Sequence, residues 1–147
     1  MQYTQRFTEN YQVGPGFFPA TYAIGVYQSA WANMANNQRA VFVLGTGAMA
    51  AGATVDVQLW QATDAAGAGA VIIAGKAIIQ LGQALGDGND SVAIELRTEE
   101  MNVSAGYNYI SAVVTVGGNT CALTGTFFLG GTNQAPVPIG LWTEIVD

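Results

Sequence analysis

Five carboxylate side chains are the residues of this sequence best suited to general acid or base chemistry: Asp56, Asp64, Glu95, Glu99 and Glu100. Two carboxylates flanking a glycosidic bond are the catalytic device of glycosidases, and Trp60 or Tyr107 could offer a flat ring to a sugar. The sequence has no histidine, so the commonest general base and every Ser–His or Cys–His pair are excluded. Glu99 and Glu100 are adjacent in a predicted turn, and solvated surface positions account for the other acids. We therefore predict that the chain is not an enzyme.

Glycine-rich stretches raise the question of a bound nucleotide or metal ion. Residues 45–52 lack the G-x-G-x-x-G spacing, and Gly69 lies one residue too far from Gly75 and Lys76 for a phosphate-binding loop. Residues 86–90 contain acids but lack the bidentate glutamate and helical flanks of an EF-hand loop, so we expect a turn there, with a weak cation site as the alternative. Cys121 is the single cysteine and cannot form an internal disulfide or a thiolate metal site. We predict no cofactor and no metal site.

Short strands are the elements that must position these side chains. Val55, Val57 and Leu59 alternate with polar or larger residues, which is the period of a half-buried strand. Residues 91–97 alternate in the same way, and residues 40–44 are nearly all apolar, as expected of a strand covered on both faces. Seven or eight such segments, separated by Gly and Asn turns, predict an all-β fold. We expect an antiparallel sandwich of jelly-roll type, with no helix longer than two turns.

The same patterns predict four local features. Residues 24–31 form the first strand. Four apolar residues share one face of a later strand, with Lys76 and Gln80 on its other face; the four are Ile73, Ala77, Ile79 and Leu81. Residues 117–119 make a tight hairpin between strands 107–116 and 120–129. In the second of these strands, four residues share a face: Cys121, Leu123, Phe127 and Leu129.

The chain divides into an extended aromatic arm, residues 1–23, and a single β-sandwich domain, residues 24–147, which includes an extended C-terminal tail. The sequence Gly14-Pro15-Gly16 and Pro19 break any continuous helix or central strand in the arm. Each large ring buries about 150–250 Å² when it packs. The arm therefore either wraps its own domain or reaches over a neighbouring chain.

Charge is scarce in this sequence. It has ten acidic and four basic residues, and residues 101–143 contain none of either. Because charge keeps soluble proteins apart, we expect other chains to cover much of the surface. The alternative is an uncovered surface made polar by Thr, Asn, Gln and Ser. A net charge of −6 with four scattered bases excludes a nucleic-acid site. No run reaches about 18 apolar residues, so we expect no membrane span.

Several segments, taken in order, resemble a known family. They are Gln61-Ala-Thr-Asp64, Ala74-Gly-Lys-Ala-Ile78, Gly86-Asp-Gly-Asn-Asp90, Ile94-Glu-Leu-Arg-Thr-Glu-Glu100 and Trp142-Thr-Glu-Ile-Val-Asp147. Over about residues 32–147 the chain resembles a small family encoded near the major capsid protein in tailed bacteriophages and prophages. That family is similar in role to capsid decoration, or cement, proteins.

The resemblance implies a jelly-roll-like trimer on the outer surface of the phage capsid, made in the host cytoplasm and carried in the virion. Its partner would be the major capsid protein, which it would clamp and stabilise. The rings of the arm and the tail are the candidate partner-binding residues: Tyr3, Phe7, Tyr11, Phe17, Phe18 and Trp142. A carbohydrate- or receptor-binding module on the same sandwich is the alternative function. A tail or head-completion component is a nearer variant.

Overall fold

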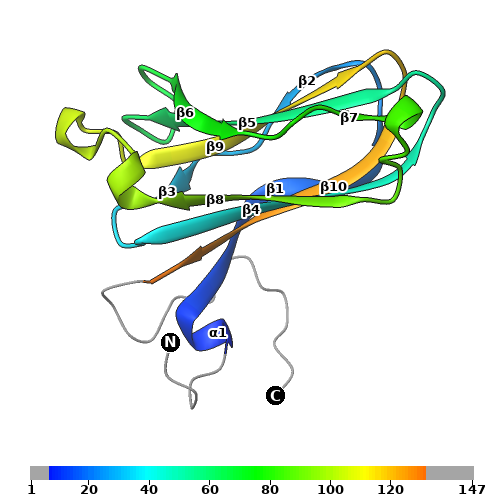
Figure 1. Cartoon of the computed structure of the whole chain (residues 1–147). Coiled ribbons are helices and arrows are strands. Elements are labelled where there is room, and N and C mark those ends of the chain that lie inside the picture. The colour runs from blue at the N-terminus through cyan, green and yellow to red at the C-terminus, as the bar shows by residue number, and fades with distance from the viewer. Residues whose placement is uncertain (1–6, 132–147) are drawn as a thin grey trace.

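Two antiparallel β-sheets face each other in the computed structural model, which describes residues 7–131 (Figure 1). The strands are β1 (Tyr11–Tyr22), β2 (Gly25–Gln28), β3 (Ala32–Asn33), β4 (Arg39–Met49), β5 (Thr54–Ala62), β6 (Val71–Ala77), β7 (Leu81–Gly82), β8 (Ser91–Arg97), β9 (Tyr109–Gly117) and β10 (Cys121–Gly130). The first sheet has the order β1-β10-β4-β8 and the second β2-β9-β5-β6, with β3 added to β9 and β7 added to β5.

Helices are minor elements of the described chain. They are α1 (Phe7–Asn10) and the 3₁₀ turns η1 (Gln83–Leu85), η2 (Thr98–Glu100) and η3 (Val103–Ala105). The prediction of no helix longer than two turns is confirmed for residues 7–131. Within the same range, no helix has the length and hydrophobicity needed to cross a membrane.

The eight longer strands pair in a nested order. The first pairs with the last, β1 with β10, and the next pairs inward are β2 with β9, β4 with β8 and β5 with β6. These pairs alternate between the two sheets, and β10–β4 and β9–β5 complete each sheet. A long hairpin folded over on itself in this way is a jelly roll. The predicted all-β sandwich of jelly-roll type is confirmed.

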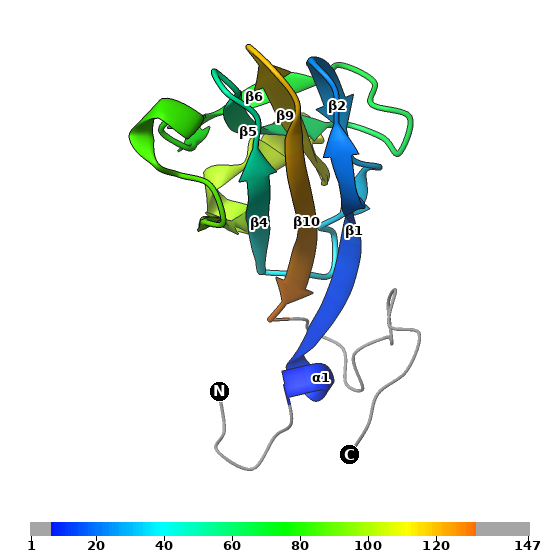
Figure 2. The same cartoon turned by 90° about the vertical axis from the view of Figure 1, so that its right-hand side faces the viewer.

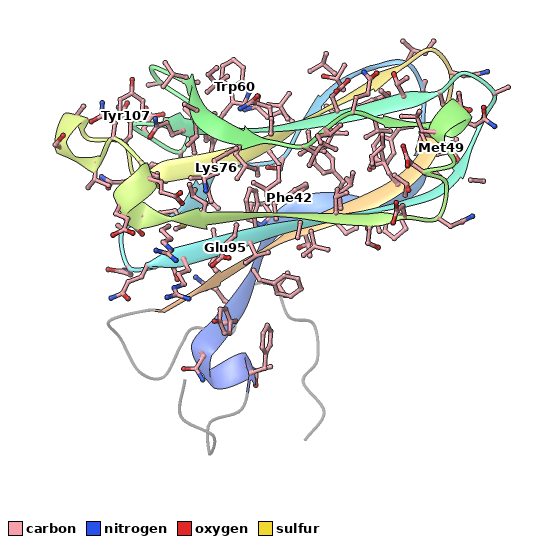
Figure 3. The ribbon with its side chains drawn as sticks, in the orientation of Figure 1. Phe42, Met49, Trp60, Lys76, Glu95 and Tyr107 are labelled. Carbon is pink, nitrogen blue, oxygen red and sulfur yellow. The ribbon has the colours of Figure 1, made fainter. Side chains whose placement is uncertain are left out.

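The core lies between the sheets and follows the predicted alternation. Val55, Val57 and Leu59 of β5 are buried, and on β10 the four residues predicted to share a face all point inward. Figure 3 shows Phe42 between the sheets, where its ring centroid lies 4.9 Å from that of Phe127. Burying a side chain of this size contributes about 1.5–3 kcal/mol of transfer free energy, so this layer stabilises both sheets at once.

The prediction that residues 1–23 are an arm and not a strand is wrong for Tyr11–Tyr22. This segment is β1, a 12-residue strand that pairs with β10 along its length. Pro15 and Pro19 are accommodated because β1 lies at the edge of its sheet and because the register shifts twice, between Val13 and Gly16 and between Phe17 and Ala20. Proline excludes a segment from a central strand but not from an irregular edge.

Two strand predictions need correction. The predicted strand 24–31 ends at Gln28, and Ser29 then occupies a buried position before β3 begins. The alternation predicted for residues 73–81 fails within β6, where Ala77 is already exposed, and Ile79 beyond the strand is 91% exposed. Its physical cause is a bulge: Gly75 has φ +74°, and the amide of Gln58 donates hydrogen bonds to the carbonyl oxygens of Ile73 and Lys76.

The turn at residues 117–119 is not a hairpin. Strands β9 and β10 belong to different sheets, so this turn carries the chain from one layer to the other. Gly118 has φ +69°, and the backbone N–H of Asn119 donates to the carbonyl oxygen of Gly117 at 2.7 Å. A Gly-Gly-Asn turn between two alternating strands fits a hairpin and a corner equally well, because both connections place one face of each strand inward.

Candidate functional site

The edge strand β1 has features that prevent further strand pairing. Pro15 and Pro19 offer no N–H group, and prolines of this kind protect sheet edges from strand addition. The hydroxyl of Tyr22 donates to the carbonyl oxygen of Phe18 at 2.9 Å. The hydroxyl of Tyr27 donates in the same way to the carbonyl oxygen of Ala23 at 3.0 Å. A partner at this edge must therefore be held through side chains.

A ladder of rings closes the sandwich between β1 and β2. It runs from the core outward, with centroid separations of 4.9 Å for Phe127–Phe42, 6.2 Å for Phe42–Phe17, 6.3 Å for Phe17–Tyr22 and 4.9 Å for Tyr22–Tyr27. The Phe42–Phe127 pair is tilted and the other three are edge-to-face; such aromatic pairs contribute about 0.5–1.5 kcal/mol beyond their buried area. The ladder makes this edge a fixed surface.

Large apolar side chains project from this closed edge. Phe18 is 87% exposed, Ile24 64% and Val26 68%. Beside Phe18, the outer face of the first sheet has a shallow hollow of about 410 Å³, lined by Val13, Gly14, Gly16, Phe17, Phe18, Pro19, Thr124, Gly125 and Thr126. We call residues 11–28, which comprise β1, β2 and the turn between them, the uncharged edge.

Within residues 10–131, charged residues are confined to the other half of the sandwich, and Glu9 lies on α1, before β1 begins. The sequence has no Asp, Glu, Lys or Arg in residues 10–38 or 101–131, so β1, β2, β3, β9 and β10 are free of charge. Every charged residue from 10 to 131 lies on β4, β5, β6, β8 or η2, or in a loop between them. Figure 2 shows β1 on one side of the first sheet and β4 on the other, with β10 between them, and β2 above β1 on the same side of the molecule.

The opposite edge, formed by β6 and β8, is held by ionic contacts. The ammonium of Lys76 donates to the carbonyl oxygen of Glu95 at 2.8 Å and pairs with the carboxylate of Glu100 at 2.8 Å (Figure 3). Glu100 also accepts the backbone N–H of Arg97 at 2.8 Å. The hydrogen bond from Lys76, followed by that from the Arg97 backbone, holds the pKa of Glu100 below its ordinary value of 4.5.

The candidate acid–base residues do not form a carboxylate pair around a shared cleft. Asp56 accepts a hydrogen bond from the amide of Gln80 at 2.6 Å, and Asp64 accepts the backbone N–H groups of its own loop. Glu99 pairs with Arg97 at 3.4 Å. Among residues 7–131, no group of three His, Cys, Asp or Glu side chains is placed to hold a metal ion. Asp56, Asp64, Glu99 and Glu100 each have a structural hydrogen bond or ion pair.

The candidate cation loop, the single cysteine and the two candidate sugar-binding rings lie at separate places in the fold. In residues 86–90, the carboxylates of Asp87 and Asp90 accept backbone N–H groups of Gly82 and Ser91 at 2.8 and 2.9 Å, which makes this segment a turn. Cys121 is buried, and desolvation raises the pKa of its thiol. Trp60 lies on the outside of the second sheet, and Tyr107 donates its hydroxyl to the carbonyl oxygen of Gly69 on a loop at the end of that sheet (Figure 3).

The candidate partner-binding rings fall into three groups. Phe7 stacks on Tyr11 with centroids 4.7 Å apart and meets Phe128 edge-on at 5.9 Å, near the start of β1. Phe17 belongs to the ladder, whereas Phe18 points outward. Tyr3 and Trp142 lie outside the described residues.

Three apolar residues were not predicted from the sequence as candidate partner-binding residues: Ile24 and Val26 of the uncharged edge, and Phe128 of the neighbouring strand β10. The uncharged run of residues 10–38 was the signal that could have indicated the first two. Phe128 could not be predicted as a surface residue, because apolar residues occupy both faces of its strand and either face could belong to the core. Only the pairing of β1 with β10 brings it beside Phe7 and Tyr11.

Comparison with known proteins adds little. No protein-family model matches the sequence, and no curated protein matches it. Among solved structures, a chain of infectious bursal disease virus, Gx strain, aligns with a TM-score of 0.45 and 10% sequence identity. The alignment covers 85% of this chain and 32% of that one, so this chain spans about a third of its length. A likeness at this level carries no argument about function.

Proposed function

We propose that this chain is a structural protein of a tailed-phage particle and not an enzyme. It binds the major capsid protein on the outer surface of the shell, acts there as a trimer and stabilises the capsid. Two observations support the proposal. Residues 32–147 resemble the capsid-associated family described above. The uncharged edge presents exposed apolar side chains at both faces of the sandwich, with Phe18 beside the hollow on the first sheet and Val26 beside the hollow on the second.

The uncharged edge is the observation that carries the structural role, namely that this chain works in contact with other chains. Large exposed apolar side chains without charges nearby are typical of surfaces that another protein chain covers. A stabilising protein needs contact area, and about 800 Å² per partner makes a standard interface. Repeated over many copies, such contacts stabilise the assembled shell by mass action, since they bind the shell and not its separated subunits.

Capsid binding tests this function directly. The purified protein is mixed with capsids lacking it, and the bound fraction is measured by co-sedimentation. We expect saturable binding to heads and a higher temperature of capsid disruption. Attachment to tails alone, or no binding, would overturn the proposal.

A carbohydrate-binding function is favoured by one separate feature. The outer face of the second sheet has a hollow of about 410 Å³, whose lining includes Trp60, Asp56 and Thr115. An indole ring beside hydrogen-bonding groups suits a sugar, whose C–H face packs on the ring while its hydroxyls bond to the polar groups. A glycan array probed with the wild type and with Trp60→Ala tests this candidate: a signal lost in the variant supports it, and no signal from the wild type rules it out.

A further inference from the structure

We infer that the uncharged edge is the contact between copies of this chain, and that the capsid protein binds a different part of the surface. The inference rests on the proposed function for the view that several copies act together. It assigns one partner, a second copy, to one named surface, residues 11–28.

Charge distribution is the first reason for choosing a second copy. The chain has a net charge of −6, so identical copies repel one another wherever their acids approach. Near any symmetry axis, a side chain meets the same side chain of its neighbours, and like charges placed together oppose association. A surface without charge avoids this penalty. A foreign partner needs no such surface, because it could offer charges of the opposite sign.

The placement of the acids agrees with this argument. Within residues 10–131, every acid lies on β5, β8 or η2 or in the loops that join β5, β6 and β8: Asp56, Asp64, Asp87, Asp90, Glu95, Glu99 and Glu100. Glu9 lies on α1, before the start of β1. If copies meet through β1 and β2, their acidic halves point away from one another. Salt screening of the remaining repulsion would then strengthen association slightly.

The shape of the edge provides the second reason. Phe18 projects from β1 next to the hollow bordered by Gly16 and Thr124. A projecting ring and a hollow on one surface are what a contact between identical chains requires, since each copy then supplies both. The prolines of β1 and the hydroxyls of Tyr22 and Tyr27 limit strand addition, so the contact is made by apolar side chains.

The test compares charge insertion at the two edges. Phe18→Asp and Val26→Asp place an acid on the uncharged edge. Ile79→Asp places one in the charged half at a position that is 91% exposed, against 87% for Phe18 and 68% for Val26. Sedimentation equilibrium is run on each full-length protein, with circular dichroism and a urea unfolding curve to show that each variant is folded. We expect the wild type and Ile79→Asp to have a mass three times the 15.3 kDa of one chain. Each edge variant should dissociate with a constant raised about 100-fold or more.

Two outcomes overturn the inference: a wild type that is monomeric at ~100 µM, well above the ~1 µM dissociation constant of a modest interface, or folded edge variants that remain trimers. Capsid binding is measured in parallel on the wild type. A trimer that requires the uncharged edge but fails to bind capsids would leave the inference standing and remove the proposed function. A wild type that binds capsids as a monomer would overturn the inference and leave capsid binding standing.

Discussion

Two glycines on adjacent strands differ in what surrounds them. At Gly125, an added Cβ would lie 2.7 Å from Cζ of the buried Phe42 ring and 3.2 Å from Leu44 Cδ1. At Gly45, the nearest atom would be Thr124 Cγ2 at 3.7 Å, an ordinary contact. The first site therefore has no room for a methyl group, whereas the second does.

We predict that Gly125→Ala lowers the free energy of unfolding by about 1–3 kcal/mol, because overpacking shifts core side chains. Gly45→Ala is the matched control and should be neutral or stabilising by up to about 1 kcal/mol. Urea unfolding curves of both variants measure the difference. Equal stability of the two would show that the core between β4 and β10 is looser than the structure indicates.

Glu100 provides a pH-dependent test at the charged edge. Its pKa is lowered in the folded chain, so it contributes stability that is present above its ordinary pKa of 4.5 and lost as the pH falls through the lowered value. Because 39% of the side chain is exposed, solvent screens the pair with Lys76, and the contribution should stay below about 1 kcal/mol.

The variant Glu100→Gln should therefore be less stable than the wild type at pH 7 and equal to it at low pH, where Glu100 is protonated. Chemical denaturation across this pH range measures the difference. Glu99→Gln is the control, since the Glu99 carboxylate is 73% exposed and its contact with Arg97 is longer, at 3.4 Å. A stability difference that does not change with pH would contradict the assignment.

At the scale of elements, β1 contains both a structural ring and a surface ring in consecutive positions. Phe17 packs edge-on against Phe42 and Tyr22, whereas Phe18 is exposed. We predict that Phe17→Ala lowers the free energy of unfolding by about 2–4 kcal/mol, somewhat below the value for a fully buried phenylalanine. Phe18→Ala should change it by less than about 0.5 kcal/mol. Thermal or urea unfolding of the isolated subunit in dilute solution separates the two, and equal losses would contradict the ladder.

Because β1 pairs with β10, deleting the N-terminal residues would disturb the fold as well as any contact with a partner. Deleting residues 1–19 removes most of β1 and leaves the edge of β10 open. Such a deletion tests folding as well as assembly. Single substitutions at Phe18 and Val26 separate these effects, because neither side chain is part of the core.

The sequence allowed the strands to be predicted better than their partners. Alternation in β5, β8 and β10 depends on which residues face the core, and it held because burial acts on each strand separately. The turn at Gly118 could not be assigned to a hairpin or a corner, since that choice depends on strands distant in sequence. The exposure of Ile79 was predicted wrongly for a similar reason. The bulge at Gly75 depends on hydrogen bonds from Gln58, which belongs to another strand.

In the whole molecule, the jelly-roll topology brings together segments that lack charged residues but lie far apart in the sequence. Its nested pairing places the uncharged segments 10–38 and 101–131 side by side, because β1 pairs with β10 and β2 with β9. The charged middle of the sequence forms the other half. Within the described residues one half of the molecule is therefore free of charge, whereas the other carries the charges together with exposed apolar side chains such as Ile72, Ile79 and Leu85.

The same division predicts how association responds to salt. If copies meet at the uncharged edge, raising the salt concentration from about 0.05 to 0.5 M should leave the dissociation constant unchanged or lower it, because only repulsion is screened. Sedimentation at both concentrations measures this effect. Dissociation at high salt would show that attractive charge pairs hold the copies together, contrary to the account.

Cryo-electron microscopy of capsids decorated with the purified protein would show whether the protein sits on the shell as a trimer joined at the uncharged edge. We expect density for three copies at each site on the outer surface of the shell, with β1 and β2 of neighbouring copies in contact and the β6–β8 edge facing solvent. Single copies with the uncharged edge exposed, or density on the tail with none on the shell, would contradict this expectation.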